Sequence, residues 1–388
     1  MQKEKLVPDI RFKGFVEEWK ESKIGNFLSV PIEEKANVNN ASQLLTLGLN
    51  LSGLKIGATK NKLHFGATNY FLRKEGQFIY GKQNFFNGSM AIITPEFHNK
   101  ASSKDVPSFD VKNIDNWFFY YYLARPSFYE KTEGLSLGTG SKRIHENILF
   151  NITIAHPESL KEQKKIRKLI SNFNSVVSLT LKKLNKLRLI KESLLSKMLA
   201  SKNQKFSEIR FKGFEEEWNI NALNELINKF DNLRIPVSEK LRTKGEFPYY
   251  GANGIQDYVS GYTHDGEFVL VAEDGANDLN NYPSKYVNGK FWANNHVHVI
   301  QGKENVLDNK FLSFSLKNFD FKPILTGGER TKLNASALAT IEINKPFINE
   351  QQKIGQFFSN LDSLIQSQEL KLEKLNSIKQ ALLEKMFC

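Results

Sequence analysis

Several things that this chain has little of narrow what it can be. It has one cysteine, Cys388, among 388 residues, which excludes an internal disulfide framework. No apolar run approaches the roughly 18 residues that a membrane-spanning helix needs. Residues 1–5 show none of the features of a signal peptide. We therefore expect a soluble, cytoplasmic protein.

Catalytic motifs are also scarce. The sequence has no nicotinamide-type glycine fingerprint, no serine nucleophile elbow and no His-Glu-x-x-His. Residues 76–83 have Walker A spacing, but Gln83 stands where a magnesium-binding Ser or Thr belongs. His296 and His298 could share a face of a strand but lack a third ligand, and residues 274–278 are typical of a capped turn. We expect no covalent chemistry and no metal.

What the chain does have is a repeat. Residues 9–19, Asp-Ile-Arg-Phe-Lys-Gly-Phe-Val-Glu-Glu-Trp, recur as residues 208–218, Glu-Ile-Arg-Phe-Lys-Gly-Phe-Glu-Glu-Glu-Trp. An apolar-periodic stretch over 162–198 recurs over 350–386 without a gap. The segments between them, roughly 25–138 and 224–325, share almost no identity. Two matched frames thus carry two different inserts.

The matched stretches are predicted to be long helices, because their apolar residues recur every three or four positions. Ser159 and Glu162 form a capping-box pattern at the first start, and residues 349–352 are a looser version. Helices of this length need a partner along the whole stripe, so we predict an antiparallel coiled coil within one chain. The alternative is that each helix packs only on its own domain. The predicted interface residues are Ile166, Phe173, Val177, Leu184, Leu187, Leu194, Ile354, Leu361, Ile365, Leu372, Leu375 and Leu382, and the same stripe passes through Ile190 and Ile378.

The charge points to a polyanionic partner. The chain has 54 Lys and Arg against 42 Asp and Glu, a formal net charge of +12. Residues 161–202 hold twelve basic and two acidic residues, whereas residues 349–388 hold five of each. The first helix therefore either lies near nucleic acid or an acidic subunit, or simply carries a solvated lysine face.

The inserts combine short β-prone segments with glycine turns, such as residues 268–272 and 296–300, and an aromatic helix is predicted over 117–129. The fold class is therefore α+β, with two sheet-rich domains. Each insert ends in a glycine turn, residues 139–147 and 326–334, in which Thr, Gly, Arg and Asn align. Such a turn suits a phosphate, although Arg143 and Arg330 could equally serve only to cap the domain.

These features together resemble the specificity subunits of type I restriction-modification systems. The resemblance is carried by the Arg-Phe-Lys-Gly-Phe-x-Glu-Glu-Trp motif at Arg11 and Arg210, by residues 247–254, 268–275 and 293–296, by the Thr-Gly turns, and by the Glu-Gln start of each helix. It spans nearly the whole chain and is weaker in the first insert. It implies target-recognition domains over 1–158 and 204–347 and spacer helices over 159–203 and 348–388.

The resemblance also implies a DNA-reading scaffold without activity of its own. Its partners would be double-stranded DNA, two methyltransferase subunits and optionally two restriction subunits, with S-adenosylmethionine, ATP and magnesium bound by those partners. The DNA-contacting side chains are expected among Lys82, Asn84, Thr139, Lys142, Arg143, Tyr250, Asn253, Asn277, Thr326, Arg330 and Lys332. The alternative is a structural adaptor that binds only proteins. A free-standing adenine methyltransferase is disfavoured, because the chain contains no Pro-Pro.

Overall fold

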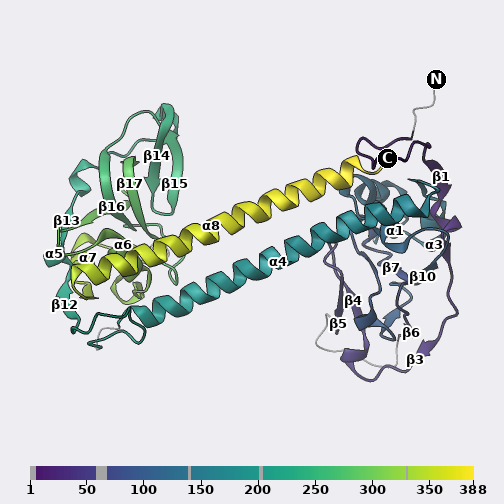
Figure 1. Cartoon of the computed structure of the whole chain (residues 1–388), viewed down its shortest axis with the longest axis horizontal. Helices are drawn as coiled ribbons and strands as arrows, with labels where there is room; N and C mark the ends of the chain where they lie inside the picture. Colours follow the sequence, from purple (N-terminus) through teal and green to yellow (C-terminus); the bar gives the residue numbers. More distant parts are fainter. Residues whose placement is uncertain (1–5, 58–67, 139–140, 201–203, 329–330) are drawn as a thin grey trace. The chain divides into compact units, whose positions relative to one another are not determined.

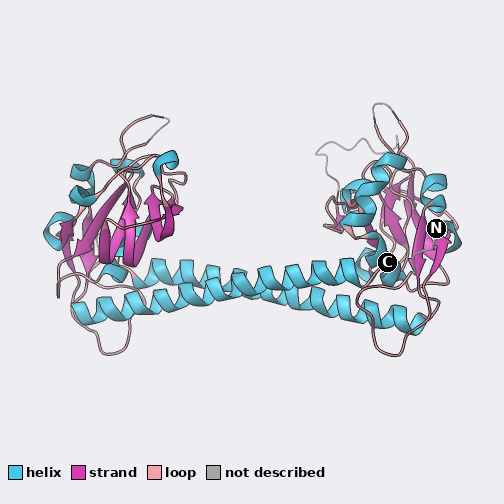
Figure 2. Ribbon diagram, turned by 90° about the horizontal axis from the view of Figure 1, so that it is seen from above, coloured by secondary structure: helices cyan, strands magenta, loops and turns pink. Residues whose placement is uncertain are grey.

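The computed structural model describes residues 6–57, 68–138, 141–200, 204–328 and 331–388 (Figure 1). The chain forms two compact units. The first unit comprises Met1–Thr180 and Lys371–Cys388, and the second comprises Leu181–Leu370. None of the described helices combines the length and the apolar character that crossing a bilayer requires. Each unit joins a body of strands and short helices to stretches of two long helices (Figure 2).

The first unit is built on short antiparallel strands. Its four-stranded sheet has the order β2 (Leu28–Ser29), β10 (Ser108–Val111), β7 (Phe78–Tyr80) and β8 (Met90–Ile92). The remaining strands form smaller sheets: β3 (Lys35–Ala36), β6 (Tyr70–Leu72) and β9 (Ala101–Ser103); β4 (Leu45–Leu47) and β5 (Leu54–Ile56); β1 (Lys20–Lys23) and β11 (Thr153–His156). An aromatic core fills the space between the main sheet and helix α1 (Asn116–Leu123).

The aromatic helix predicted over 117–129 is two helices. α1 ends at Leu123, and α2 runs from Pro126 to Tyr129. Arg125, the residue before the proline, has extended backbone angles of φ −78° and ψ 129°. A residue before proline is disfavoured in the helical region, which explains the break. A further helix, α3 (Glu146–Asn151), follows the glycine turn.

The second unit has a larger sheet. Its order is β13 (Ile227–Lys229), β18 (Val297–Gly302), β16 (His264–Ala272), β17 (Ser284–Ala293), β14 (Lys244–Gly251) and β15 (Gly254–Val259). All neighbours are antiparallel except β14 and β17. Helix α6 (Asn309–Lys317) packs on one face through Phe311 and Leu312. Strands β12 (Asn219–Ala222) and β19 (Glu342–Lys345) pair separately, and α5 (Leu223–Leu226) and α7 (Ala335–Ala339) are short.

The two long helices are α4 (Leu160–Met198, 39 residues) and α8 (Ile348–Lys385, 38 residues). In the first unit, Ile166 near the start of α4 shares a core with Met386, just beyond the end of α8. In the second unit, Met198 at the end of α4 shares a core with Ile354 near the start of α8. The predicted α+β class and antiparallel helix pairing are therefore confirmed.

All twelve predicted interface residues are buried or half-buried. Ile166, Leu184, Ile354 and Ile365 are buried, and the other eight predicted interface residues are half-buried: Phe173, Val177, Leu187, Leu194, Leu361, Leu372, Leu375 and Leu382. Ile190 and Ile378 were wrongly placed, since they are 39% and 38% exposed. Lys191 and Lys379 take these positions instead, because a coiled-coil stripe alternates steps of three and four residues and the step from Leu187 falls on 191.

The repeated motif at residues 9–19 and 208–218 ties each insert to both long helices. Arg11 binds both carboxylate oxygens of Glu162 at 2.8 and 2.9 Å, and Arg210 binds both of Glu350 at 2.7 Å. Both glutamates lie in the first turn of a long helix and are 1% exposed. The hydrogen bond to its glutamate raises the pKa of each arginine. The motif thus holds the start of one helix.

The same motif also holds the end of the other helix. In the first unit the Ile10 N–H donates to the Lys385 carbonyl at 2.8 Å, and in the second the Ile209 N–H donates to the Lys197 carbonyl at 3.0 Å. These bonds satisfy carbonyls that have no partner within their own helix. Each unit therefore clamps one helix start and one helix end with the same segment.

The residue after each glutamate completes the clamp. Gln163 accepts from the Asp115 N–H at 2.8 Å and donates to the Pro157 carbonyl at 2.8 Å. Gln351 accepts from the Asp308 N–H at 2.9 Å and makes the equivalent bond to Pro346 at 2.8 Å. Asp115 and Asp308 are the N-caps of α1 and α6. The long helices are thereby fixed to the insert helices.

The predicted capping box at residues 159–162 is only half formed. The Ser159 hydroxyl accepts from the Glu162 N–H at 3.4 Å. The Glu162 carboxylate does not reach back to Ser159, because Arg11 occupies both of its oxygens. A tertiary ion pair to Arg11 has replaced the local hydrogen bond of the capping box.

Removing one partner of this pair is expected to destabilise the first unit. Arg11→Ala leaves the Glu162 carboxylate buried and uncompensated, at a cost of roughly 3 kcal/mol in the free energy of unfolding. The control is Lys20→Ala, which breaks an ion pair to Glu158 whose side chains are 60% and 58% exposed, at a cost of at most about 1 kcal/mol. Urea unfolding followed by circular dichroism measures both. Equal losses in the two variants would refute the clamp.

Candidate nucleic-acid interface

The residues on either side of the glycine turn pair in the same way in both units. Leu137 and Arg143 exchange backbone hydrogen bonds of 3.0 and 2.9 Å, and Thr326 and Lys332 exchange bonds of 2.9 and 2.7 Å. Gly138 and Gly327 stand at equivalent places with left-handed φ values of 115° and 93°, which favour glycine.

This geometry corrects the alignment made from the sequence. There, Arg143 was matched with Arg330, but the backbone pairing makes Arg143 equivalent to Lys332, two residues further on. The buried Ile144 and Leu333 follow as the next equivalent pair. The sequence alignment matches residues of the same type, whereas backbone pairing shows which residues occupy the same position in the two turns. Thr139 and Arg330 lie outside the described residues.

In the first unit, the predicted residues that the structure describes come together around this turn. The Lys82 carbonyl accepts from the Ile144 N–H at 2.8 Å, which places Lys82 beside Arg143. Asn84 accepts from the Asn87 amide at 3.2 Å in the loop after Lys82.

Each of the three cations in this cluster already has a carboxylate partner. The ion pairs are Lys82 with Glu146 at 2.6 Å, Lys142 with Glu133 at 2.7 Å, and Arg143 with Asp105 at 3.5 Å. The cluster is therefore a set of charge pairs, and a phosphate that binds there must compete with carboxylates.

In the second unit, three separate loops meet at the equivalent place. Asn253, in the β14–β15 hairpin, donates to the Gly275 carbonyl at 2.9 Å and accepts from the Asn277 N–H at 2.9 Å. The Gly275 N–H donates to the Thr331 carbonyl at 3.3 Å. The predicted Asn253, Asn277, Thr326 and Lys332 are thus brought together, and the Thr326 hydroxyl accepts from the Asn334 amide at 3.1 Å.

Tyr250 does not belong on this surface. Its side chain is 7% exposed and lies in the core, where its ring contacts that of Phe291 edge-on at 5.7 Å. We therefore withdraw Tyr250 as a DNA-contacting residue. Tyr250 lies in the segment 247–254 that also supplies Asn253, but the alternation of side chains along β14 turns its ring inward. Asn253, at the tip of the hairpin, bonds to the neighbouring loop instead.

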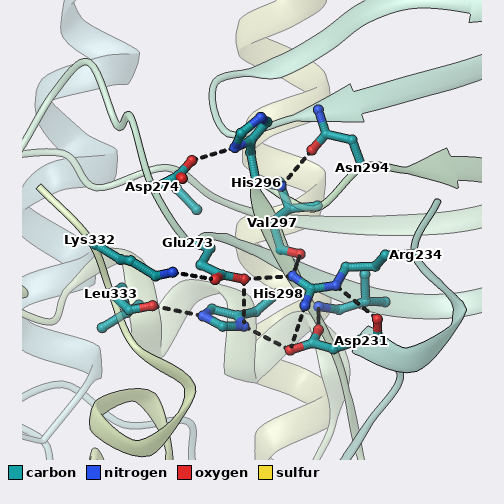
Figure 3. Close-up of polar contacts among 12 residues, drawn as sticks. Asp231, Arg234, Glu273, Asp274, Asn294, His296, Val297, His298, Lys332 and Leu333 are labelled. Atoms are coloured by element: carbon teal, nitrogen blue, oxygen red, sulfur yellow. Dashed lines mark hydrogen bonds and ion pairs between the residues drawn. The ribbon is translucent and has the colours of Figure 1, made fainter. Parts of the chain in front are cut away.

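A polar network that sequence reasoning missed underlies the second-unit loops (Figure 3). Glu273, at the end of β16, binds Lys332 at 3.2 Å and Arg234 at 2.7 Å. Its carbonyl accepts from the Leu333 N–H at 2.6 Å. Glu273 thus joins the glycine turn to the sheet by side chain and backbone together.

His298, which is 1% exposed, lies at the centre of the same network (Figure 3). Its Nδ1 is 2.8 Å from Asp231 Oδ2, and its Nε2 is 2.9 Å from the Leu333 carbonyl. Both partners lie within hydrogen-bonding distance, so His298 links the turn to the loop that contains Asp231.

The network favours ionised carboxylates. Burial opposes ionisation of Asp231, but hydrogen bonds from His298 and from the Val299 N–H outweigh it and lower its pKa. Burial likewise opposes ionisation of Glu273, while hydrogen bonds from Arg234 and Lys332 lower its pKa. No local sequence pattern could have revealed this, since Asp231 and His298 are 67 residues apart.

His296 and His298 do not act together. His296 Nδ1 lies 2.5 Å from Asp274, whereas His298 contacts Asp231. Within the described ranges, no three His, Cys, Asp or Glu side chains are placed to hold a metal ion. These histidines serve the loop network.

The network predicts acid sensitivity of the second unit. The pKa values of Asp231 and Glu273 are lower in the folded protein than their unfolded values of about 4. The stabilisation that these carboxylates provide is therefore present above about pH 4 and is lost as pH falls through the folded pKa values. Asp231→Asn should lose about 2 kcal/mol at neutral pH and show a flatter decline of Tm in acid. Scanning calorimetry from about pH 7 to about pH 3 measures this. Asp265→Asn, at an exposed position, is the control and should follow the wild type; a wild-type slope in Asp231→Asn would contradict the assignment.

Comparison with known proteins agrees with these features. The family model described as "Type I restriction modification DNA specificity domain" matches the chain twice, over residues 16–189 and 215–378. The chain therefore belongs to the type I restriction-modification DNA specificity family. Each match covers one insert together with most of the long helix that follows it.

Individual relatives support the same family. A putative type I restriction enzyme specificity subunit of Haemophilus influenzae is 49% identical over 162 residues, which are 42% of this chain and 41% of that protein. The chain thus spans about two fifths of that relative. The type I restriction enzyme MjaVIII specificity subunit of Methanocaldococcus jannaschii is 21% identical over 339 residues, 79% of this chain and 74% of that protein.

Solved structures show the fold. The S subunit of a type I restriction-modification system from M. genitalium superposes with a TM-score of 0.68 at 18% identity and covers 98% of this chain and 99% of its own. A structure concerned with complex assembly and conformational transition of the type I R-M system gives a TM-score of 0.51 at 13% identity over 95% of this chain and 97% of its own. The likeness is one of architecture.

Proposed function

We propose that this chain is the sequence-specific DNA-binding specificity subunit of a type I restriction-modification complex. It recognises a bipartite, asymmetric target, with one half-site read by each insert. The observation that carries the proposal is that two units with the same helix clamp and the same glycine turn hold unrelated loops beside that turn. Equivalent frames with different loops fit two different base sequences.

In this proposal the phosphate and base contacts come from different parts of the interface. Arg143 and Lys332, on the turn that both units share, contact the DNA backbone. Asn253 and Asn277, on loops found only in the second unit, contact base edges, since an amide can both donate to and accept from a base. The Asn253 amide makes one bond through each of its two polar atoms within the loops and keeps a second N–H and a second lone pair for a base. Phosphate contacts fix orientation, and base contacts supply specificity.

The long helices serve as the scaffold for two methyltransferase subunits and optionally two restriction subunits. Apolar side chains remain exposed on α4 outside the paired stripe: Val176 and Leu179 in the first unit, and Leu181 and Leu189 in the second. Exposed apolar residues on a helix favour contact with another protein. The chain itself performs no catalysis, and S-adenosylmethionine, ATP and magnesium are bound by the partner subunits.

The alternative of a protein-binding adaptor is distinguished by DNA binding itself. A DNA reader binds a duplex in a salt-dependent manner, because its cations release counterions from the phosphates. We expect Arg143→Ala and Lys332→Ala each to weaken binding to all duplexes and to reduce the slope of log K against log salt by about one. Fluorescence anisotropy over a salt series measures this. Wild-type affinity and slope in both folded variants would remove these residues from the interface.

Modularity provides the direct test of bipartite reading. Residues 1–155 are exchanged for the matching segment of another specificity subunit, and the hybrid is expressed with its methyltransferase partner. The expected result is a methylated motif in which one half changes and the other is retained, because each unit holds its own core and turn. Long-read sequencing of methylated genomic DNA measures the motif. An assembled, active hybrid that changes both halves would contradict independent reading.

A further inference from the structure

The turn cations of the two units share a feature that their sequences do not. Arg143 Nη1 lies 3.5 Å from Asp105, and Lys332 Nζ lies 3.2 Å from Glu273. The two cations occupy equivalent positions, as the backbone pairing of the turns shows. The two carboxylates do not: Asp105 lies between β9 and β10, and Glu273 follows β16. Different parts of two unrelated inserts therefore bring an acid to the same cation.

The backbone of the turn that carries Asp105 is held in place by hydrogen bonds. The Lys82 N–H donates to the Asp105 carbonyl at 2.9 Å. Arg73, which is 2% exposed, donates to the Ser103 and Val106 carbonyls at 3.2 and 3.3 Å. These two carbonyls flank Asp105 on either side of the turn. A buried guanidinium is costly unless it is fully hydrogen-bonded, so the turn that carries Asp105 is built into the fold.

Glu273 is fixed by an equally specific arrangement. Its carboxylate is 16% exposed and is held by Arg234 at 2.7 Å as well as by Lys332. Its carbonyl accepts from the Leu333 N–H, the residue next to Lys332. Arg143 and Lys332 are 36% and 48% exposed, so both cations can be reached from solvent. The Asp105 side chain is itself 59% exposed and is positioned only by its turn, whereas Glu273 is largely buried.

We propose that Asp105 and Glu273 compete with DNA phosphate for Arg143 and Lys332 and thereby weaken the sequence-independent part of DNA binding. This inference rests on the proposed function. A phosphate that approaches the turn must displace a carboxylate from its cation. Because phosphate contacts form whatever the base sequence, this cost falls equally on specific and nonspecific complexes. The carboxylates thus lower the affinity for every duplex, and only a target that adds base contacts makes up for the loss.

The test uses the full chain with Asp105→Asn, which removes the charge and retains the shape. Probes are a random-sequence duplex and a duplex that contains the target mapped from methylated DNA. We expect nonspecific affinity to rise about two- to fivefold at low salt, the range of an exposed ion pair. The salt slope should steepen, and affinity for the target should rise by a similar factor, because both complexes use the same phosphate contact. Glu96→Gln, an exposed acid at the opposite end of β8 from the Lys82 loop, removes the same charge and should change neither affinity.

A double variant shows whether the effect acts through the cation. In an Arg143→Ala background, Asp105→Asn should have no further effect on nonspecific affinity, because the competing pair is already gone. Unchanged or weaker nonspecific binding by a folded Asp105→Asn single variant would overturn the competition. An increase that persists without Arg143 would overturn it as well. A wild-type protein that does not prefer its target duplex would instead overturn the proposed function. The comparison of variants on the random-sequence duplex does not depend on such a preference, so the two failures can be told apart.

Discussion

The arginine–glutamate pair at the start of each long helix is the interaction on which the rest of the structure depends. Arg11–Glu162 and Arg210–Glu350 are bidentate and nearly sealed from solvent. Neither arginine can leave without abandoning a charge in the interior. Because the same segment also bonds to the end of the opposite helix, the pair fixes a helix start, a helix end and an insert at one point. The insert loops can then vary without moving the frame.

Much of the fold could be predicted because its signals are periodic or repeated. The stripe of α4 and α8 and the duplicated motif were visible in the sequence, and the helix bounds differ from those expected by about two residues. The errors came from tertiary competition. Ile190 looked like a stripe residue until the heptad step placed Lys191 there, and Glu162 left its capping box for Arg11. A local sequence pattern describes a single helix, whereas the burial and the partner of each side chain also depend on the elements that pack against that helix.

The candidate interface was less predictable, for a different reason. Its residues meet across long sequence separations, as with Glu273 and Lys332 or Arg143 and Asp105. The glycine turns were recognisable, yet matching arginine to arginine gave an alignment two residues away from the one that backbone pairing defines. Tyr250 had a persuasive context and an inward-facing ring. Composition indicates which residues suit DNA; only strand register and burial decide which of them reach it.

The lysines within the apolar stripe have a consequence for how the helices find each other. Lys191 lies among apolar stripe positions and ion-pairs with Asp362 of α8. If the helices slid by a heptad so that Gly355 took the place of Asp362, the apolar residues would still meet, but the ammonium group would lose its partner. A slide in the other direction would bring Glu369 there and take it away from Arg188. Leucine alone would tolerate both alignments, whereas each slide costs these helices an ion pair, so charge within and beside the stripe favours the native register.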